Sequence, residues 1–432
     1  MHRLVPDFII DNYAHGNMSG EFPAVSLFID VSGFTAATEA LMAFGQHGAE
    51  VLADIMGAIF DPLVYNVYAQ GGFITNFAGD AFAAVFPIKN ESDIAETAVR
   101  ALAAAWDSQD KLKTVRHQET IYGDFEFTAK AGMAVGLASW GILESKDQQR
   151  AAYYFKGTAN TGCTDAEHLA NAGDIITSPT ILDLLGKSIG FEGVADYGQV
   201  TAVHISLPTA QPVNLPPVNL PLTTRFFPNV IVEQPISGEF RLVFNLFINL
   251  KGIPSLTEIS TFMDIFFTLQ DQYGGVSNRI DYGDKGCHIL AFWGVPPSYE
   301  NDINRISNFI LDLKDKSTIP LRAGITYQIA HAGYSGSSLQ QEYTCFGRGV
   351  NLAARFMVAS DWHEIGIDDD TETRLTSKFQ TKFLDFMTFK GFAKPQPIFA
   401  ITVQVSPSDA AGFVILSDNV CVCNRHIPDG IR

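Results

Sequence analysis

The sequence has little cysteine, and its few cysteines form no pairing pattern. Five occur in 432 residues, an odd number, at scattered positions: Cys163, Cys287, Cys345, Cys421 and Cys423. Disulfide frameworks belong mainly to oxidising compartments and small secreted domains, so this usage favours a reducing, cytoplasmic location. The spacing of Cys421 and Cys423 is too short for a zinc-binding pair, and no second pair follows. We expect neither a disulfide framework nor structural zinc.

Positive charge is also scarce. Lysine and arginine number 29 against 47 aspartates and glutamates, which gives a net charge of −18. Nucleic acids and anionic membrane surfaces bind basic proteins, so neither is expected as the main partner. A small anionic nucleotide remains compatible with this charge, because Mg²⁺ and a few local cations can offset the repulsion.

Long apolar runs are missing as well. No run approaches the ~18–20 residues of a membrane-spanning helix, and the N-terminus lacks a signal-peptide layout. The apolar share of 47% and the charged share of 18% are typical of a folded globular chain. We therefore expect two or three globular domains and no membrane span.

Two short segments near the N-terminus each combine apolar residues, an aspartate and a glycine. The first, FIDVSGFT (28–35), is predicted to end a strand near Asp30 and to open a helix. The second, FAGDAF (77–82), is predicted as a tight turn between two strands and carries Asp80. Carboxylates at one sheet edge beside a Gly-rich turn suit metal-bound phosphate. The alternative is a capping aspartate and a turn aspartate, which are both common.

The same pattern occurs twice along the chain. VSLFIDV (25–31) recurs as FNLFINL (244–250), and the stretch between the two copies holds a proline-rich run at 207–228. Such a run is typical of a semi-rigid linker. We predict a first domain at 1–206, the linker at 207–228, a second domain at 229–405 and an unassigned tail at 406–432. Each domain is predicted to be a ferredoxin-like α+β unit with the order βαββαβ.

Each copy lacks a set of polar side chains that the other copy retains. Asp30 and Asp80 correspond to Asn249 and Cys287 in the second copy, which therefore lacks both carboxylates.

The second copy instead carries Asn351 and Arg355 at helical i, i+4 spacing. Their first-copy counterparts are predicted as Thr161 or Asn160, and a residue near Thr164. Two copies packed about a pseudo-twofold axis would place the carboxylates of one beside the amide and guanidinium of the other. One complete site would result.

Four segments carry a resemblance to a known family: FIDVSGFTAATE (28–39), GGFITNFAGDA (71–81), GDKGC (283–287) and EYTCFGRGVNLAARFM (342–357). Over roughly residues 4–400 the chain resembles the class III nucleotidyl cyclases, and their soluble adenylyl cyclase branch in particular. The resemblance implies two cyclase domains packed head to tail as an intramolecular pseudo-heterodimer, in a monomeric chain. It also implies conversion of ATP to 3′,5′-cyclic AMP and pyrophosphate.

The resemblance assigns a role to each candidate residue. Two Mg²⁺ or Mn²⁺ ions, with Ca²⁺ as an alternative, would be held by two aspartates and a backbone carbonyl: Asp30, Asp80 and Val31. The triphosphate would meet a Gly-rich turn and a lysine: Gly33, Phe34, Thr35 and Lys130. Asn351 would orient the ribose, and Arg355 would stabilise charge at the α-phosphate. Taken alone, Lys130 is more typical of a residue on an edge strand.

Base choice depends, by the same resemblance, on Arg279 and Thr344. A cationic donor with a hydroxyl acceptor suits adenine, although a guanidinium can also address guanine. In this branch the second site holds bicarbonate between a lysine and an arginine, and the corresponding positions here are Asn76 and Thr164. The alternatives to an adenylate cyclase are a guanylate cyclase and a catalytically silent nucleotide-binding module.

Overall fold

The structure, a computed structural model, describes residues 2–233, 238–283, 286–389, 392 and 394–404, together with the backbone of 413–416 and 420–423. The first half contains these helices: α1 (Asp7–Ala14), α2 (Phe34–Met42), α3 (Gly45–Ala69), α4 (Ile94–Val115), α5 (Thr158–His168) and α6 (Pro179–Leu185). Its strands are β1 (Ser19–Ser32), β2 (Phe73–Ala78), β3 (Ala81–Pro87), β4 (His117–Thr120), β5 (Gly123–Glu126), β6 (Thr128–Glu144), β7 (Ala151–Lys156), β8 (Ile175–Thr177), β9 (Ile189–Val194) and β10 (Tyr197–Val203).

Two short helices, α7 (Leu220–Phe226) and α8 (Asn229–Glu233), lead into the second half. Its helices are α9 (Leu256–Tyr273), α10 (Asp302–Lys316), α11 (Arg348–Ala359) and α12 (Asp369–Glu372). Its strands are β11 (Glu239–Leu250), β12 (Val276–Gly283), β13 (Gly286–Trp293), β14 (Leu321–Gly336), β15 (Gln341–Phe346), β16 (Ile365–Ile367), β17 (Phe379–Met387) and β18 (Gln396–Gln404). The predicted tail at 406–432 lies outside the described residues except for β19 (Phe413–Leu416) and β20 (Val420–Cys423).

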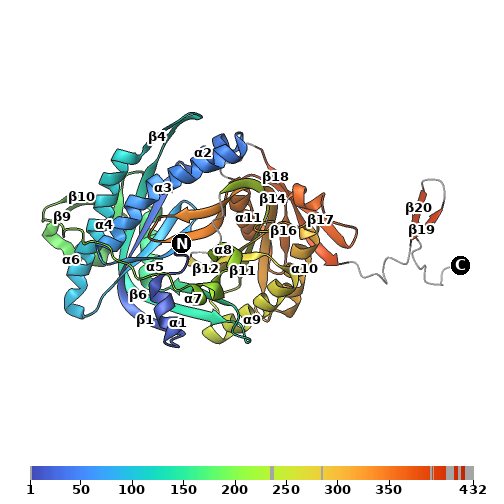
Figure 1. Ribbon diagram of the computed structural model, residues 1–432, viewed down its shortest axis with the longest axis horizontal. Helices are drawn as coiled ribbons and strands as arrows, with labels where there is room; N and C mark the ends of the chain where they lie inside the picture. Colours follow the sequence, from blue (N-terminus) through green and yellow to red (C-terminus); the bar gives the residue numbers. More distant parts are fainter. Residues whose placement is uncertain are drawn as a thin grey trace.

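The two halves have the same sheet connectivity. Within the described residues, one sheet has the order β2-β3-β1-β6-β8-β10-β9 with β7 on β6, and the other has β12-β13-β11-β14-β16-β18-β17 with β15 on β14. The sheets lie side by side, the first half on the left and the second on the right of Figure 1. The predicted α+β fold and its internal duplication are confirmed, with strands added to each predicted βαββαβ unit.

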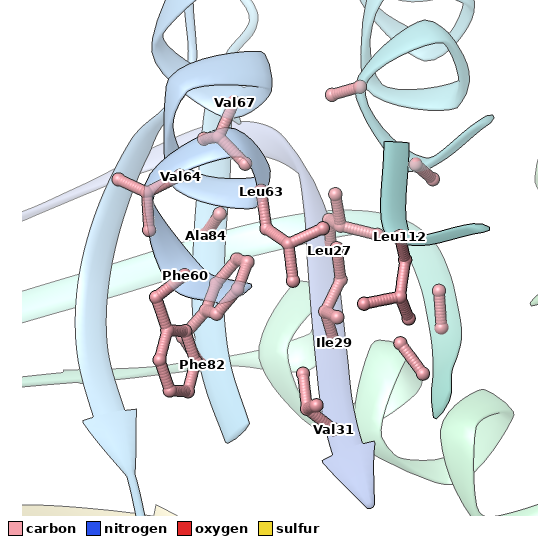
Figure 2. Packing of buried hydrophobic residues seen from close by; sticks show 14 of the residues in the cluster. Leu27, Ile29, Val31, Phe60, Leu63, Val64, Val67, Phe82, Ala84 and Leu112 are labelled. Carbon is pink, nitrogen blue, oxygen red and sulfur yellow. The ribbon is translucent and has the colours of Figure 1, made fainter. Parts of the chain in front are cut away.

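Alternation along β1 divides its side chains between the core under α3 and the opposite face of the sheet, which α5 contacts. Leu27, Ile29 and Val31 are at most 2% exposed and pack against α3, which supplies Phe60 and Leu63, as Figure 2 shows. Successive side chains of a strand point to opposite faces, so Asp30 projects away from this core. By length and composition α3 could cross a membrane, but half of its most apolar window is buried in the protein, as in a core helix.

Two local predictions differ from the structure. The proline-rich stretch 207–228 contains a helix, α7, whose N-cap Asn219 accepts a hydrogen bond from the backbone N–H of Leu222. Lys130 lies on β6, between β1 and β8, so its interpretation as an edge residue is wrong.

The halves contact each other reciprocally, as a pseudo-twofold axis requires. Strand β2 contacts β15 while β12 contacts β7, and α3 contacts β14 while α9 contacts β6. Asp61 on α3 accepts a hydrogen bond from the backbone N–H of Ser338 at 2.7 Å. At the position related by the pseudo-twofold axis, Asp264 on α9 accepts a hydrogen bond from the backbone N–H of Lys146 at 3.0 Å. Each half thus caps a strand-connecting turn of the other.

These two aspartates provide a test of the packing. We expect Asp61→Ala and Asp264→Ala each to lower the free energy of unfolding by ~1 kcal/mol, because each removes a hydrogen bond between the halves. Urea denaturation followed by circular dichroism measures this. Asp54→Ala, at an exposed position on the same helix as Asp61, is the matched control and should change little. Equal effects of all three substitutions would contradict the assigned contacts.

Candidate active site between the two halves

Asp30 and Asp80 meet at one end of the first sheet. Asp30 pairs across the sheet with Ala81, the residue after Asp80, and the N–H of Val31 donates to the backbone carbonyl of Asp80 at 3.0 Å. Burial, followed by the charge of Asp30, raises the pKa of Asp80 to about 6. Two partly buried carboxylates that repel each other suit a divalent cation.

Asp30 also belongs to a group of charges beneath α5. The ammonium of Lys130 lies 3.7 Å from the Asp30 carboxylate and 2.6 Å from that of Glu167. Burial and the charge of Glu167 raise the pKa of Asp30, and Lys130 opposes them. The side chain of Glu167 is 5% exposed. Sequence reasoning did not identify Glu167, because a glutamate in a helical segment is ordinarily a surface residue.

The turn between β1 and α2 depends on glycine. Gly33 has a φ of 121°, and a Cβ on it would lie 2.6 Å from the carbonyl oxygen of Glu126. Phe34 is buried and its ring stacks on Phe60 at 5.5 Å, so only its backbone can meet a ligand. Thr35 is exposed at the start of the helix. Free N–H groups at this helix start are suited to phosphate.

Residues from both halves line one cavity beside the carboxylates. Its lining includes Thr35 and Asp80 from the first half and Asn351 from the second. Asp30, Lys130 and Arg355 are not among its lining residues. Arg355 follows one helical turn after Asn351 on α11. Burial and the nearby charge of Arg348 lower the pKa of Arg355, and its guanidinium lies 5.4 Å from the ring of Phe392.

The two predicted base-recognition residues do not line this cavity. Thr344 is 1% exposed on β15. The guanidinium of Arg279 donates to the carboxylate of Asp281 and lies 3.8 Å from that of Glu342. Burial raises the pKa of Glu342 to about 8. Arg279 is therefore engaged in an internal ion cluster, and its contact with a base stays a prediction.

Register fixes which residues of the second half occupy the corresponding positions. Asn249 pairs with His288 and Arg322 as Asp30 pairs with Ala81 and Lys130, so Asp80 corresponds to Cys287, as predicted. Arg322 donates to the side-chain oxygen of Asn249 at 3.0 Å. A cation thus bonds the residue that stands in place of the first carboxylate.

Close packing of glycines fixes the helix register as well. A Cβ on Gly132 would meet the carbonyl of Cys163 at 2.0 Å, and one on Gly324 would meet that of Ala353 at 2.1 Å. Cys163 and Ala353 are therefore equivalent, and by the same offset Asn351 corresponds to Thr161. The counterpart of Arg355 is Asp165, one residue beyond the predicted Thr164. The charge at that position is reversed, not only lost.

The residues present fit a metal ion whose ligands come partly from the protein and partly from a bound substrate. No group of three or more His, Cys, Asp and Glu side chains that could hold a metal occurs in the described part of the chain. Mg²⁺ commonly binds through one or two carboxylates together with substrate phosphates and water. Asp30, Asp80 and the carbonyl of Val31 match that chemistry.

Comparison with known proteins gives relatives over most of the chain. Adenylate cyclase type 10 from Homo sapiens is 25% identical in an alignment 413 positions long, which covers 82% of this chain and 25% of the relative. The Mus musculus protein is 23% identical in an alignment 466 positions long, which covers 91% of this chain and 27% of the relative. The chain spans about a quarter of the length of these relatives. No protein-family model matches it.

A solved structure shares the arrangement of both halves. A class III adenylyl cyclase-like ATP-binding protein from Pseudomonas aeruginosa aligns with a TM-score of 0.57 at 10% identity, covering 83% of this chain and 86% of that one. Together with the sequence relatives, this confirms the resemblance to class III nucleotidyl cyclases with tandem domains.

The raised pKa of Asp80 predicts a pH-dependent cost to the metal-free protein. The pKa of the Asp80 carboxyl is about 6 in the folded protein and near 3.8 ordinarily. The free energy of unfolding therefore falls as pH rises from 3.8 to 6, by at most ~3 kcal/mol. Asp80→Asn should therefore raise the melting temperature at pH 8 but not at pH 4, where the carboxyl is largely protonated. Added Mn²⁺ should stabilise the wild type at pH 8 and the variant much less. Equal melting temperatures of both proteins at pH 8 would contradict the raised pKa.

Proposed function

We propose that the chain is an adenylate cyclase that converts ATP to 3′,5′-cyclic AMP and pyrophosphate at one composite site between its halves. The observation that carries the proposal is the cavity shared by Asp80, Thr35 and Asn351. Its three kinds of group, the Asp80 carboxylate, a helix N-terminus and an amide, are those that a metal–nucleotide complex requires, and Asp30 lies next to Asp80 across the sheet. Similarity to adenylate cyclase type 10 supports a cyclase.

The proposed chemistry divides between the halves. Asp30, Asp80 and the Val31 carbonyl would hold two divalent ions, whose chemistry when bound would be to favour ionisation of the ribose 3′-hydroxyl and to offset charge on the pyrophosphate. The chain's own residues bind and orient the nucleotide. The N–H groups of the 33–35 turn and the Lys130 ammonium meet the triphosphate. Asn351 holds the ribose, and Arg355 stabilises charge that develops at the α-phosphate.

Base recognition is part of the proposal. In the metal-bound nucleotide complex, Arg279 and Thr344 would face the base, and the lack of a carboxylate at either position favours adenine. This requires the guanidinium of Arg279 to exchange its bond with Asp281 for the nucleotide. We also propose that the chain acts as a cytoplasmic monomer.

Incubation of the purified chain with ATP and Mn²⁺ or Mg²⁺, followed by chromatography, tests the proposal directly. Cyclic AMP and pyrophosphate should form in equal amounts. Asp30→Asn and Asp80→Asn should abolish turnover. Asn351→Ala and Arg355→Ala should lower kcat about a hundredfold with a smaller effect on KM, because their contacts strengthen in the transition state.

Three outcomes would contradict the proposal. Turnover by Asp30→Asn or Asp80→Asn at the wild-type rate would refute the metal ligands. Faster turnover of GTP than of ATP would make the chain a guanylate cyclase. Nucleotide binding without any turnover would make it a silent binding module, and the similar P. aeruginosa chain is itself described as an ATP-binding protein.

Bicarbonate should not activate the enzyme. Asn76 donates a hydrogen bond to the carboxylate of Asp281 at 3.0 Å, so the position taken by a lysine in the soluble branch is neutral here and bonded to an acid. A small anion in a buried pocket needs a cation to offset its desolvation. Tens of millimolar bicarbonate, at fixed pH and ionic strength, should leave cyclic AMP production unchanged. A saturable, several-fold activation would show that another cation has taken over this role.

A further inference from the structure

Lys130 has two acidic neighbours, and it is closer to the one that is not a predicted metal ligand. Its ammonium lies 2.6 Å from Glu167 and 3.7 Å from Asp30. Glu167 is almost fully buried on α5, whereas Asp30 stands at the open end of the sheet beside Asp80. A buried glutamate without a partner would be costly, so Lys130 and Glu167 stabilise each other.

We propose that Glu167 is a positioning residue that draws the Lys130 ammonium toward itself, weakens its ion pair with Asp30 and so leaves the Asp30 carboxylate available to a divalent ion. Without Glu167, the ammonium would move from 3.7 Å into closer contact with Asp30 and compete with the metal for its oxygens. With Glu167 in place, Lys130 stays beside the metal site. It can then turn to the substrate phosphates when they arrive.

The second half has no buried glutamate at the position that corresponds to Glu167. The residue equivalent to Glu167, by the glycine register, is Met357, which is 2% exposed. The residue equivalent to Lys130 is Arg322, and its guanidinium donates directly to Asn249. The half without the buried glutamate is thus also the half in which the cation bonds the residue that replaces Asp30. The two halves differ there as the proposal requires.

The inference rests on the proposed role of Asp30 as a metal ligand, and metal binding can be measured without turnover. The probe is Mn²⁺ alone, titrated into the full chain without nucleotide and followed by electron paramagnetic resonance of free Mn²⁺. We expect Glu167→Gln to raise the Mn²⁺ dissociation constant about tenfold, the usual scale for partners that orient metal ligands. Lys130→Met should lower it, because it removes the competing cation.

The double variant Glu167→Gln/Lys130→Met distinguishes positioning from direct charge. If Glu167 acts through Lys130, its substitution should change Mn²⁺ affinity less than about twofold once Lys130 is absent. An equal loss in both backgrounds would mean that Glu167 acts by its own charge, and would overturn the proposal. Glu167→Met, which copies the buried Met357, should weaken Mn²⁺ binding as Glu167→Gln does, with circular dichroism confirming the fold. Wild-type affinity in both Glu167 variants would also overturn it.

The Asp30→Asn variant distinguishes a wrong metal role for Asp30 from a wrong role for Glu167. If the wild type and Asp30→Asn bind Mn²⁺ equally, the metal role of Asp30 is wrong, and the role of Glu167 fails with it. If Asp30→Asn loses Mn²⁺ while Glu167→Gln retains it, only the inference about Glu167 is wrong.

Discussion

The reciprocal packing of the two halves is the constraint on which the rest of the structure depends. Asp61 and Asp264 occupy matching positions on α3 and α9, and each accepts a hydrogen bond from a turn of the opposite half. This pairing brings the carboxylate end of the first sheet next to the start of α11. Within the described residues, the groups of the candidate site come from both halves. The cavity that they line therefore exists only when the two halves are paired.

Buried charge is distributed unequally across the pseudo-twofold axis. On one side, Asp30 and Glu167 share Lys130 while Asp80 adds a third carboxylate beside Asp30, and the excess negative charge suits a divalent cation. On the other side, Arg322 is bonded to the neutral Asn249 and to the carbonyl of Val358 at 2.8 Å. The same backbone therefore carries an acidic site in one half and, in the other, a site where an arginine replaces the lysine and neutral side chains replace the carboxylates.

The sequence was sufficient for the fold class, the duplication and the pairing of Asp30 with Asp80, since these follow from strand patterns and tight turns. The register of Asn249 and Cys287 was also predictable, because the repeated strands keep their spacing. Partners set by tertiary contact could not be predicted. Glu167 gave no local signal of burial, and the approach of Arg279 on β12 to Glu342 on β15 depends on strands that are far apart in the sequence.

The bond between Arg322 and Asn249 has a consequence for how the chain would respond to its substrate. Because neutral residues replace both carboxylates in the second half, and a guanidinium already bonds one of them, that half lacks the ligands for a second metal–nucleotide complex. Under the proposed function each chain then takes up one equivalent of nucleotide. Its rate would follow a simple hyperbola in substrate concentration, with no cooperativity arising within the chain. Any steeper response would have to originate outside these two halves.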